Sequence, residues 1–375
     1  MRIAIDARMM GPGNTRGIGR YVEELVRAML AAAPEHRYVL IVRTAEHPFA
    51  GHPSVETIVA DIPWYGLAEQ IRMPGVLRSA RADRILIPHW NVPLLCPRPF
   101  VVTIHDLLLR HEPHSAKTST RNALVRWVKR IGYRISLAHA LRSAERILVP
   151  TKFVAKDVAL FYPTTGSRVI VTGEGMPKVT SEQWTVNKEP YLLYVGSAYP
   201  HKGVQDLLNA WALIAPKHPD LTLKIAGESD VFMRHLQSET VKHDLPHVEF
   251  LGRVSESQLA GLYEHALAFI FPSHFEGFGL PPLEAIARGC SVISSDAEAL
   301  TEVLGSDGAI FFRAGDPNAI LAAVERFLND PTAARERTIR SAEQLASRHS
   351  WKEAALCTLS ALGDDRFRSP SWLPA

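Results

Sequence analysis

The chain has 375 residues, of which 46% are hydrophobic and 22% charged, and this composition is typical of a globular protein with about two domains. No apolar run reaches the ~18 residues that a membrane-spanning helix needs. The N-terminal MRIAID lacks the pattern of a signal peptide. Three widely spaced cysteines (Cys96, Cys290 and Cys357) exclude a disulfide framework and a CxxC metal site. We therefore expect a cytoplasmic protein.

The net charge of +3 conceals opposite charges in the two halves of the chain. Residues 1–180 contain 25 Lys and Arg against 14 Asp and Glu, whereas residues 181–375 contain 17 against 25. The N-terminal half, at +11, is therefore the half that we expect to meet a negatively charged partner.

Strand-like and helix-like segments alternate along nearly the whole chain. The first strand, Ile3–Ile5, leads into a glycine-rich loop and a helix near Tyr21–Ala33. Further strands are predicted in two series, at residues 38–42, 84–87, 101–104 and 146–149, and then at 191–195, 221–225, 247–250, 268–271 and 292–294. This alternation predicts an α/β protein with parallel sheets that carry helices on both faces.

A polar segment without periodicity divides the two series of strands. It is rich in turn residues and is therefore predicted to be a linker, at residues 173–190. We expect an N-terminal domain at 1–172, a C-terminal domain at 191–350, and a final segment at 351–375 that returns toward the N-terminal domain. Two domains of this kind place ligands at the carboxyl ends of their strands, in the cleft between them.

The stretch HFEGFGLPPLEAIARGCSVISSD, residues 274–296, is the most informative part of the chain. A buried strand ending at Phe271 is followed by a loop with Glu276 and by a helix that begins near Pro281 and contains Glu284. Free backbone N–H groups at 278–280 beside the helix N-terminus form an anion site. The helix dipole favours a glutamate in the first turns of a helix, so Glu284 alone does not indicate a site. Glu276 beside an anion site indicates a ligand with hydroxyls and phosphate, such as a nucleotide sugar.

Polar residues also follow other predicted strands. His105 can be a structural group or a catalyst, and at a cleft the two interpretations are equally good. Lys202, ahead of the helical pattern Val204–Ile214, is either an ordinary surface charge or a phosphate clamp. The glycines after the first strand do not have the spacing of a dinucleotide site, which disfavours a dehydrogenase.

No Asp-x-Asp occurs in the chain, and no histidines cluster with metal-ligand spacing. A bound diphosphate would then be neutralised by lysine and helix N-termini. We expect no metal site and no cofactor requirement.

Several segments together resemble one enzyme family. The run EGFGLPPLEA, from Glu276 to Ala285, resembles the E-x7-E signature of retaining glycosyltransferases of family 4. The segments GSAYPHKG, IAGE, FLGRV and the opening IDAR…GIGRY match the same family in the same order, over essentially the whole chain. The resemblance implies the GT-B fold, two Rossmann-like domains facing each other, with the acceptor on the N-terminal domain and the donor on the C-terminal domain.

The resemblance also implies roles for individual residues. Glu276 would contact the donor sugar, Lys202 would hold the diphosphate, and His105 would lie near the transferred sugar, so these three form the catalytic set. Glu284 would bind the ribose hydroxyls. The other implied donor-binding positions are Gly17, Gly19, Gly196, Ser197, Arg253, Val254, Phe278, Gly279 and Leu280.

One departure from the family concerns the charge around the diphosphate. Many relatives carry an arginine a few residues before the lysine, where this chain has Ser197-Ala198-Tyr199. Arg16 or Arg20 would have to supply part of the missing positive charge.

The implied reaction is retaining transfer of a hexose from a nucleotide sugar to a saccharide or polyprenyl-linked acceptor, in lipopolysaccharide O-antigen or exopolysaccharide assembly. Mannose is the favoured sugar and GDP-mannose the favoured donor, and no nucleic-acid partner is expected. Two alternatives remain open. One is a sugar-nucleotide epimerase of the same fold, and the other is a non-catalytic nucleotide-sugar-binding protein.

The segment 117–147 contains eight Lys and Arg but one acid, Glu145, and its apolar residues recur at helical spacing. It is either a helix that packs its apolar face on its own domain, or a helix that docks on the cytoplasmic face of an anionic membrane. A solvated face normally mixes charges of both signs, which favours docking. The candidate acceptor or membrane contacts are Arg126, Trp127, Lys129, Arg130 and Arg134.

Overall fold

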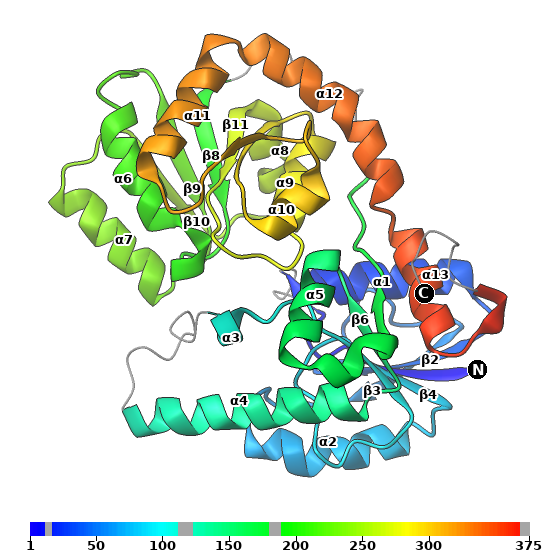
Figure 1. Cartoon of the computed structure of the whole chain (residues 1–375). Coiled ribbons are helices and arrows are strands. Elements are labelled where there is room, and N and C mark those ends of the chain that lie inside the picture. The colour runs from blue at the N-terminus through cyan, green and yellow to red at the C-terminus, as the bar shows by residue number, and fades with distance from the viewer. Residues whose placement is uncertain (12–16, 112–122, 180–188, 368–375) are drawn as a thin grey trace. The chain divides into compact units, whose positions relative to one another are not determined.

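The computed structural model describes residues 1–11, 17–111, 123–179 and 189–367, and they form two compact α/β units (Figure 1). Unit 1 comprises the described residues within Met1–Leu107, Thr120–Gly175 and His349–Ala375. Unit 2 comprises those within Leu108–Ser119 and Met176–Arg348.

Unit 1 is built on a seven-stranded parallel sheet of order β3-β2-β1-β4-β5-β6-β7. Both faces of such a sheet are covered, which explains continuous apolar runs such as RYVLIV in β2. The strands are β1 (Arg2–Asp6), β2 (Arg37–Val42), β3 (Val55–Val59), β4 (Arg84–Ile87), β5 (Phe100–Thr103), β6 (Arg146–Val149) and β7 (Val169–Val171).

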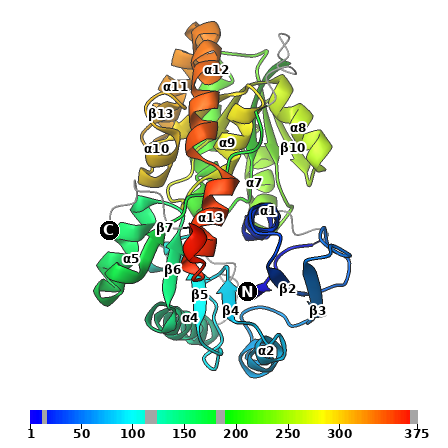
Figure 2. The same cartoon turned by 90° about the vertical axis from the view of Figure 1, so that its right-hand side faces the viewer.

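Helices cover both faces of this sheet. The long helices are α1 (Ile18–Ala32), α2 (Leu67–Ser79), α4 (Ala123–Ser143), α5 (Lys152–Phe161) and α13 (Trp351–Ala361), and short 3₁₀ helices lie at Pro163–Arg168 and Asp365–Phe367. Helix α13 packs on α1, and Leu359 shares a core with Leu25 and Met29. The two helices α2 and α4 lie side by side in both views of the chain (Figures 1 and 2).

Unit 2 contains a six-stranded parallel sheet of order β10-β9-β8-β11-β12-β13. Its strands are β8 (Glu189–Val195), β9 (Thr222–Ala226), β10 (Val248–Gly252), β11 (Ala266–Phe271), β12 (Ser291–Ser295) and β13 (Ile310–Phe312). Its helices are α3 (Leu108–His111), α6 (Val204–Ile214), α7 (Val231–Lys242), α8 (Glu256–His265), α9 (Leu280–Ala287), α10 (Glu298–Leu304), α11 (Pro317–Asn329) and α12 (Pro331–Arg348). Among the described helices of both units, none combines the length and apolarity required to cross a membrane.

The two parallel sheets confirm the predicted pair of Rossmann-like domains. Three strands, β3, β7 and β13, were not predicted, and all three lie at the edge of a sheet. Their pattern is weak because an edge strand is short or half-exposed, as the burial of β3 shows. Glu189 and Pro190, which were assigned to the linker, belong to β8, whereas residues 180–188 of the predicted linker lie outside the described residues.

Candidate active site

The loop between β11 and α9 carries Glu276 and opens the helix as the sequence predicts. Gly279 is the N-cap of α9 with φ 95°, and a Cβ at this position would lie 2.4 Å from the side chain of Leu300. Only glycine fits this conformation in this space. The prolines in the first turn confirm the predicted start of α9, and the left-handed Gly289 (φ 67°) follows its end.

Lys202 and Glu276 form an ion pair, with 2.6 Å between Nζ and Oε1. Lys202 ends a 3₁₀ helix, Pro200–Lys202, and is followed by the left-handed Gly203 (φ 66°). A Cβ on Gly203 would lie 2.1 Å from the carbonyl oxygen of Pro272, so the lysine turn and the Glu276 loop touch at the backbone. The side chains are only 22% and 12% exposed, which strengthens their attraction relative to a pair in water. Sequence reasoning placed both residues in the donor site but missed that they pair with each other.

Further contacts hold the Glu276 loop in place. His274 donates its backbone N–H to the carbonyl oxygen of His201 (2.7 Å), and its ring pairs with Asp206 on α6 (2.6 Å). Ser295 at the end of β12 bonds the carbonyl oxygen of Ser273. Burial, followed by the charges of Lys202 and His274, lowers the pKa of His201 to about 3, so this ring is neutral at pH 7. The loop is thereby preorganised by the elements around it.

Glu284 is a buried carboxylate of α9, only 8% exposed. It accepts a hydrogen bond from the hydroxyl of Tyr263 on α8, with 3.4 Å between the oxygens. A buried carboxylate is costly unless it is hydrogen-bonded, so Tyr263 helps to keep Glu284 in place. Sequence reasoning did not identify Tyr263.

The remaining predicted donor positions of unit 2 fall at strand ends. Phe278 and Gly279 are buried next to Glu276, and Leu280 begins α9. Gly196 follows β8, and Ser197 accepts a hydrogen bond from the Tyr194 hydroxyl through its carbonyl oxygen (2.6 Å). Arg253, which is exposed, and Val254 follow β10, and Ser255 then caps α8 in a capping box with Gln258.

Gly17, Gly19 and His105 belong to unit 1. Gly17 is the N-cap of α1 with φ 50°, and Gly19 is buried in the first turn of the helix. Arg20 lies on the same helix, whereas Arg16 lies outside the described residues.

His105, which follows β5, has a hydrogen-bond acceptor at each ring nitrogen. Nδ1 lies 3.2 Å from Oε1 of Glu174, and Nε2 lies 3.0 Å from the carbonyl oxygen of Pro88. Burial lowers the pKa of His105, but the hydrogen bond and charge of Glu174 outweigh it, and the pKa is raised above its ordinary value. Both acceptors are satisfied at once only by the protonated ring.

Glu174 was assigned to the linker, and sequence reasoning missed its role. The side chain is 6% exposed and faces His105 from the segment that follows β7. The signal that could have found it is the short apolar run Val169–Val171 just before it, which forms the unpredicted strand β7, because the carboxyl ends of parallel strands lie at the same edge of a sheet.

A buried polar network lies at the ends of β1 and β4 in unit 1. Arg8, 1% exposed, donates to both carboxylate oxygens of Asp6 (2.8 and 2.7 Å) and to Oε1 of Glu69 (2.6 Å). The other oxygen of Glu69 accepts hydrogen bonds from the Asn91 side chain and the backbone N–H of Tyr65. Burial lowers the pKa of Arg8, but Asp6 and Glu69 raise it above its ordinary value.

This network lines a hollow that also contains His89 and Trp64. Burial, followed by the charges of His105 and Arg8, lowers the pKa of His89 to about 3. The indole Nε1 of Trp64 is buried without a hydrogen-bond partner among the described residues. The IDAR segment, which contains Asp6 and Arg8, was recognised from the sequence, but nothing in the sequence pointed to Glu69 or Asn91.

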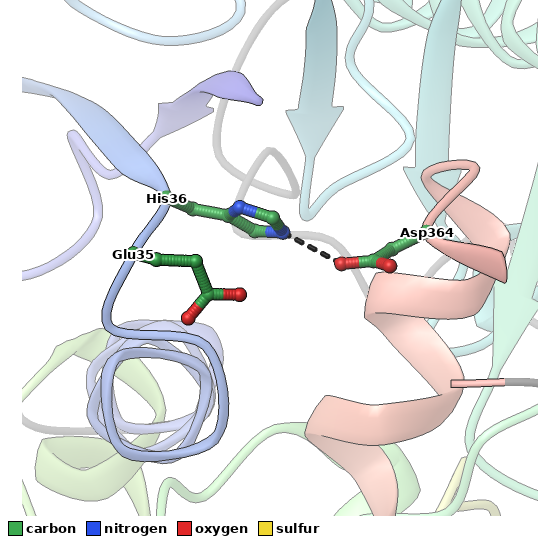
Figure 3. A group of neighbouring side chains, drawn as sticks. All are labelled: Glu35, His36 and Asp364. Atoms are coloured by element: carbon green, nitrogen blue, oxygen red, sulfur yellow. Dashed lines mark hydrogen bonds and ion pairs between the residues drawn. The ribbon is translucent and has the colours of Figure 1, made fainter. Parts of the chain in front are cut away.

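Glu35, His36 and Asp364 are close enough to one another to hold a metal ion (Figure 3). The guanidinium of Arg366, however, lies 2.5 Å from Glu35 and 2.6 Å from Asp364. His36 completes the cluster with a 2.7 Å contact to Asp364. The hydrogen bond from Arg366 is the main cause of the lowered pKa of Asp364. The guanidinium of Arg366 therefore already neutralises these carboxylates. Its ion pairs tie the segment after α13 to the segment before β2.

The chain has two α/β units, each built on a parallel sheet. At the strand ends of the second sheet, a lysine–glutamate pair lies beside the N-terminus of a helix. This arrangement is that of the GT-B class of glycosyltransferases. The family models agree along almost the whole chain. The model described as glycosyltransferase family 4 matches residues 15–176, and the model described as glycosyl transferases group 1 matches residues 178–345. The two models together cover most of the chain, which therefore belongs to the glycosyltransferases that they describe.

Similar proteins include two bacterial O-antigen enzymes. The O-antigen chain mannosyltransferase RfbU of Salmonella typhimurium is 26% identical over 72% of this chain and 72% of its own. The O-antigen chain mannosyltransferase B of Escherichia coli is 26% identical over 92% of this chain and 95% of its own.

Solved structures share the fold at lower identity. WaaG, a glycosyltransferase involved in lipopolysaccharide biosynthesis, superposes with a TM-score of 0.74 at 16% identity, covering 96% of this chain and all of its own. HepE of Anabaena, in complex with UDP and glucose, has a TM-score of 0.72 at 16% identity, covering 97% of this chain and 100% of its own. These likenesses confirm the GT-B fold.

Proposed function

We propose that the protein transfers a hexose with retention from a nucleotide sugar to a saccharide or lipid-linked saccharide during cell-surface polysaccharide assembly. GDP-mannose is the favoured donor, because the O-antigen relatives that align over most of the chain are named mannosyltransferases. The observation that carries the proposal is the Lys202–Glu276 pair, which meets the N-terminal end of α9.

The ion pair gives the donor site a simple way to respond to its ligand. A diphosphate carries more negative charge than Glu276, so it competes for the ammonium of Lys202. The released carboxylate is then available to the sugar. As the bond to the leaving diphosphate breaks, Lys202 and the positive end of the α9 dipole stabilise the developing charge.

Unit 1 supplies the proposed acceptor side of the reaction. The ring of His105, held between Glu174 and the carbonyl oxygen of Pro88, would fix this edge of unit 1 beside the transferred sugar. The hollow around Asp6 and Asn91 offers carboxylate and amide oxygens of the kind that bind hydroxyl groups. The hollow itself, of about 10 Å³, holds no more than a water molecule, so we assign to acceptor recognition the polar strand ends of unit 1 that surround it.

A panel of nucleotide sugars tests the proposal. Release of nucleoside diphosphate that depends on a lipid-linked acceptor, with a matching glycosylated product, is the expected result. Conversion of the donor without acceptor would indicate the epimerase instead. Binding without any turnover across the panel would indicate a non-catalytic nucleotide-sugar-binding protein.

We predict that Lys202→Ala weakens the binding of free GDP by about 1.5 kcal/mol, or roughly tenfold, because a charge-assisted contact is lost. The expected loss is at the low end for such contacts, since Lys202 must leave Glu276 to bind the ligand. Isothermal titration calorimetry measures it. Lys217→Ala is the matched control, because Lys217 forms a 2.6 Å pair with Glu325 elsewhere in unit 2. Equal GDP affinity in both variants would contradict the assignment of Lys202.

We predict that transfer activity survives EDTA. Lysine and a helix N-terminus can neutralise the diphosphate, and the chain has no Asp-x-Asp to hold a metal beside it. The measurement is the initial rate before and after chelation. A rate that collapses in EDTA and returns with Mg²⁺ or Mn²⁺ would show that the reaction needs a metal.

A further inference from the structure

A stacked pair of aromatic side chains lies at the strand ends of unit 1. Tyr65 precedes α2 and Trp90 follows β4, and their ring centroids are 5.3 Å apart at an interplanar angle of 29°. Tyr65 is 57% exposed, although aromatic side chains contribute most to stability when they are buried. We call these two residues the aromatic platform. No step of the proposed reaction has yet given them a role.

The backbone of Tyr65 is held in a strained conformation. Its φ angle is 62°, in the left-handed region that a bulky residue rarely adopts. The backbone N–H of Tyr65 donates to Oε2 of Glu69 (2.8 Å), and Glu69 is itself buried and paired with Arg8 (2.6 Å). Strain of this kind persists where the surrounding structure imposes it, and it is concentrated at functional sites. The buried ion pair therefore presents an exposed aromatic ring at a cost in free energy, which indicates that the ring has a ligand.

Neighbouring rings fix the orientation of the aromatic platform. Trp90 makes an edge contact with Tyr133 of α4, with 4.7 Å between the centroids and an angle of 87°, and Tyr133 is buried. The ring of His89 lies 5.6 Å from that of Tyr65 and 4.9 Å from that of Trp90. Both rings of the platform are thus held from more than one side. A surface that is ordered before binding loses little entropy when a ligand packs on it.

The helix that supplies Tyr133 also carries the acceptor contacts that the sequence suggested. Those whose side chains are described are all exposed: Trp127, Lys129, Arg130 and Arg134. The side chain of Arg126 lies outside the described residues. The contact with the aromatic platform is therefore made from the buried side of α4, and not from the side to which the sequence drew attention.

The hydrogen bonds around the aromatic platform leave one donor for a ligand. Nδ1 of His89 accepts a hydrogen bond from the backbone N–H of Asn91 (3.3 Å). The ring of His89 is neutral at pH 7, because its pKa is lowered to about 3, so its one hydrogen is assigned to Nε2. Nε2 then donates to the hydroxyl oxygen of Tyr65 (3.2 Å). The hydroxyl of Tyr65 keeps its own hydrogen, which it can donate to a ligand.

We infer that the aromatic platform binds a pyranose ring of the acceptor saccharide, a role that rests on the proposed transfer reaction. One face of a pyranose consists mainly of C–H groups, and their partial positive charge suits the electronegative face of an aromatic ring. Trp90 covers one face of the Tyr65 ring, so the sugar packs on the other. The hydroxyls at the edge of the sugar meet the Tyr65 hydroxyl and the carboxylate of Asp6, which lines the same hollow as His89.

An isoprenoid chain is a poorer occupant of the aromatic platform. It offers C–H groups to the ring of Tyr65, but it has no group that accepts a hydrogen bond from the Tyr65 hydroxyl or donates one to Asp6. An apolar surface with a few well-placed polar groups is typical of a site for a small polar ligand, and these groups fix the orientation of the ligand. The aromatic platform therefore recognises the sugar of an acceptor and not its lipid.

Saturation-transfer difference NMR on the full chain with GDP tests this role. The probes are the methyl glycosides of mannose, galactose, rhamnose and N-acetylglucosamine, with geranyl phosphate as the isoprenoid probe. We expect saturation to reach the ring C–H protons of at least one glycoside. Titration of that glycoside then gives its dissociation constant for each variant.

Three variants of Tyr65 separate the possible causes of a loss of binding. Tyr65→Leu keeps an apolar side chain without an aromatic face and should bind the glycoside roughly tenfold more weakly. Tyr65→Phe keeps the ring and should lose less, roughly threefold, because only a hydroxyl contact is removed. Tyr65→Gly relieves the backbone strain, so it should be at least as stable in urea as Tyr65→Leu and still bind the glycoside weakly.

Tyr162→Ala is the matched control for the loss of an aromatic ring. Tyr162 is half-buried and ends α5, a helix that runs back from the carboxyl ends of the strands to the opposite edge of the sheet. Glycoside affinity should not change in this variant. The role of the aromatic platform would be overturned if no glycoside received saturation. It would also be overturned if Tyr65→Leu bound as the wild type does, if Tyr162→Ala lost as much affinity, or if geranyl phosphate bound with the same dependence on Tyr65.

The aromatic platform and the proposed transfer reaction can fail separately. The GDP affinity of Tyr65→Leu should equal that of the wild type, because the donor site lies in unit 2. Glycoside binding that depends on Tyr65, in a protein that turns over no donor, would leave the sugar site standing and remove the reaction. Turnover in which Tyr65→Leu keeps the acceptor KM of the wild type would leave the reaction standing and remove the role of the platform.

Discussion

Glu276→Gln is expected to lower the turnover number by roughly 10²-fold or more while changing donor affinity only slightly. The glutamine preserves the size of a side chain that is 12% exposed. It removes the negative charge that, in the proposed reaction, faces the sugar once Lys202 has moved to the diphosphate. Glu284→Ala is expected to act differently. A contact to ribose hydroxyls stabilises ground and transition states alike, so its loss mainly raises the donor KM.

Steady-state kinetics with varied donor, together with calorimetry on the bound nucleotide, separates these effects. Glu264→Gln is a suitable control for the loss of a paired carboxylate, because Glu264 bonds Arg288 (2.9 Å) beyond the opposite end of α9. If Glu276→Gln loses affinity and keeps its turnover number, Glu276 is a binding residue and the catalytic assignment is wrong.

The parts of the site that could be predicted are those whose signals are local in sequence. Glu276, the glycines around it, the prolines of α9 and Glu284 all lie within one short segment. Each residue type there has a local physical reason, such as a left-handed backbone at Gly279 or a proline in a first helical turn. The buried central strands were predicted for the same reason, since their apolar runs are continuous.

The parts that were missed depend on contacts between distant segments. Glu174 is 69 residues from His105, and Glu69 is 61 residues from Arg8. No periodicity or motif links such pairs, because each becomes adjacent only when parallel strands align their carboxyl ends. The buried face of α4 could not be predicted either, for a related reason. Its apolar residues cover more than one face, and only the packing of Tyr133 and Leu137 decides which face is buried.

The largest effect on stability is expected from Arg8→Met, at about 3–5 kcal/mol of the free energy of unfolding. Among the described residues, Arg8 is the one cation that pairs with the carboxylates of both Asp6 and Glu69, and it also donates to the carbonyl oxygen of Ile62 (3.1 Å). Methionine fills much of the same volume as arginine, so little of the lost stability comes from a cavity. Most of it comes from the carboxylates of Asp6 and Glu69, which are left without their positive partner. Urea-induced unfolding followed by circular dichroism measures it.

Two further variants show whether charge is the cause of this loss. Arg27→Met removes an arginine that is 54% exposed and pairs with Glu23, and a surface pair of this kind contributes at most about 1 kcal/mol. Adding Glu69→Gln to Arg8→Met removes one of the two stranded carboxylates, which should restore part of the lost stability although the hydrogen bonds of Arg8 remain absent. A double variant no more stable than Arg8→Met, or an Arg8→Met cost as small as that of Arg27→Met, would mean that the network is held by packing and not by its charges.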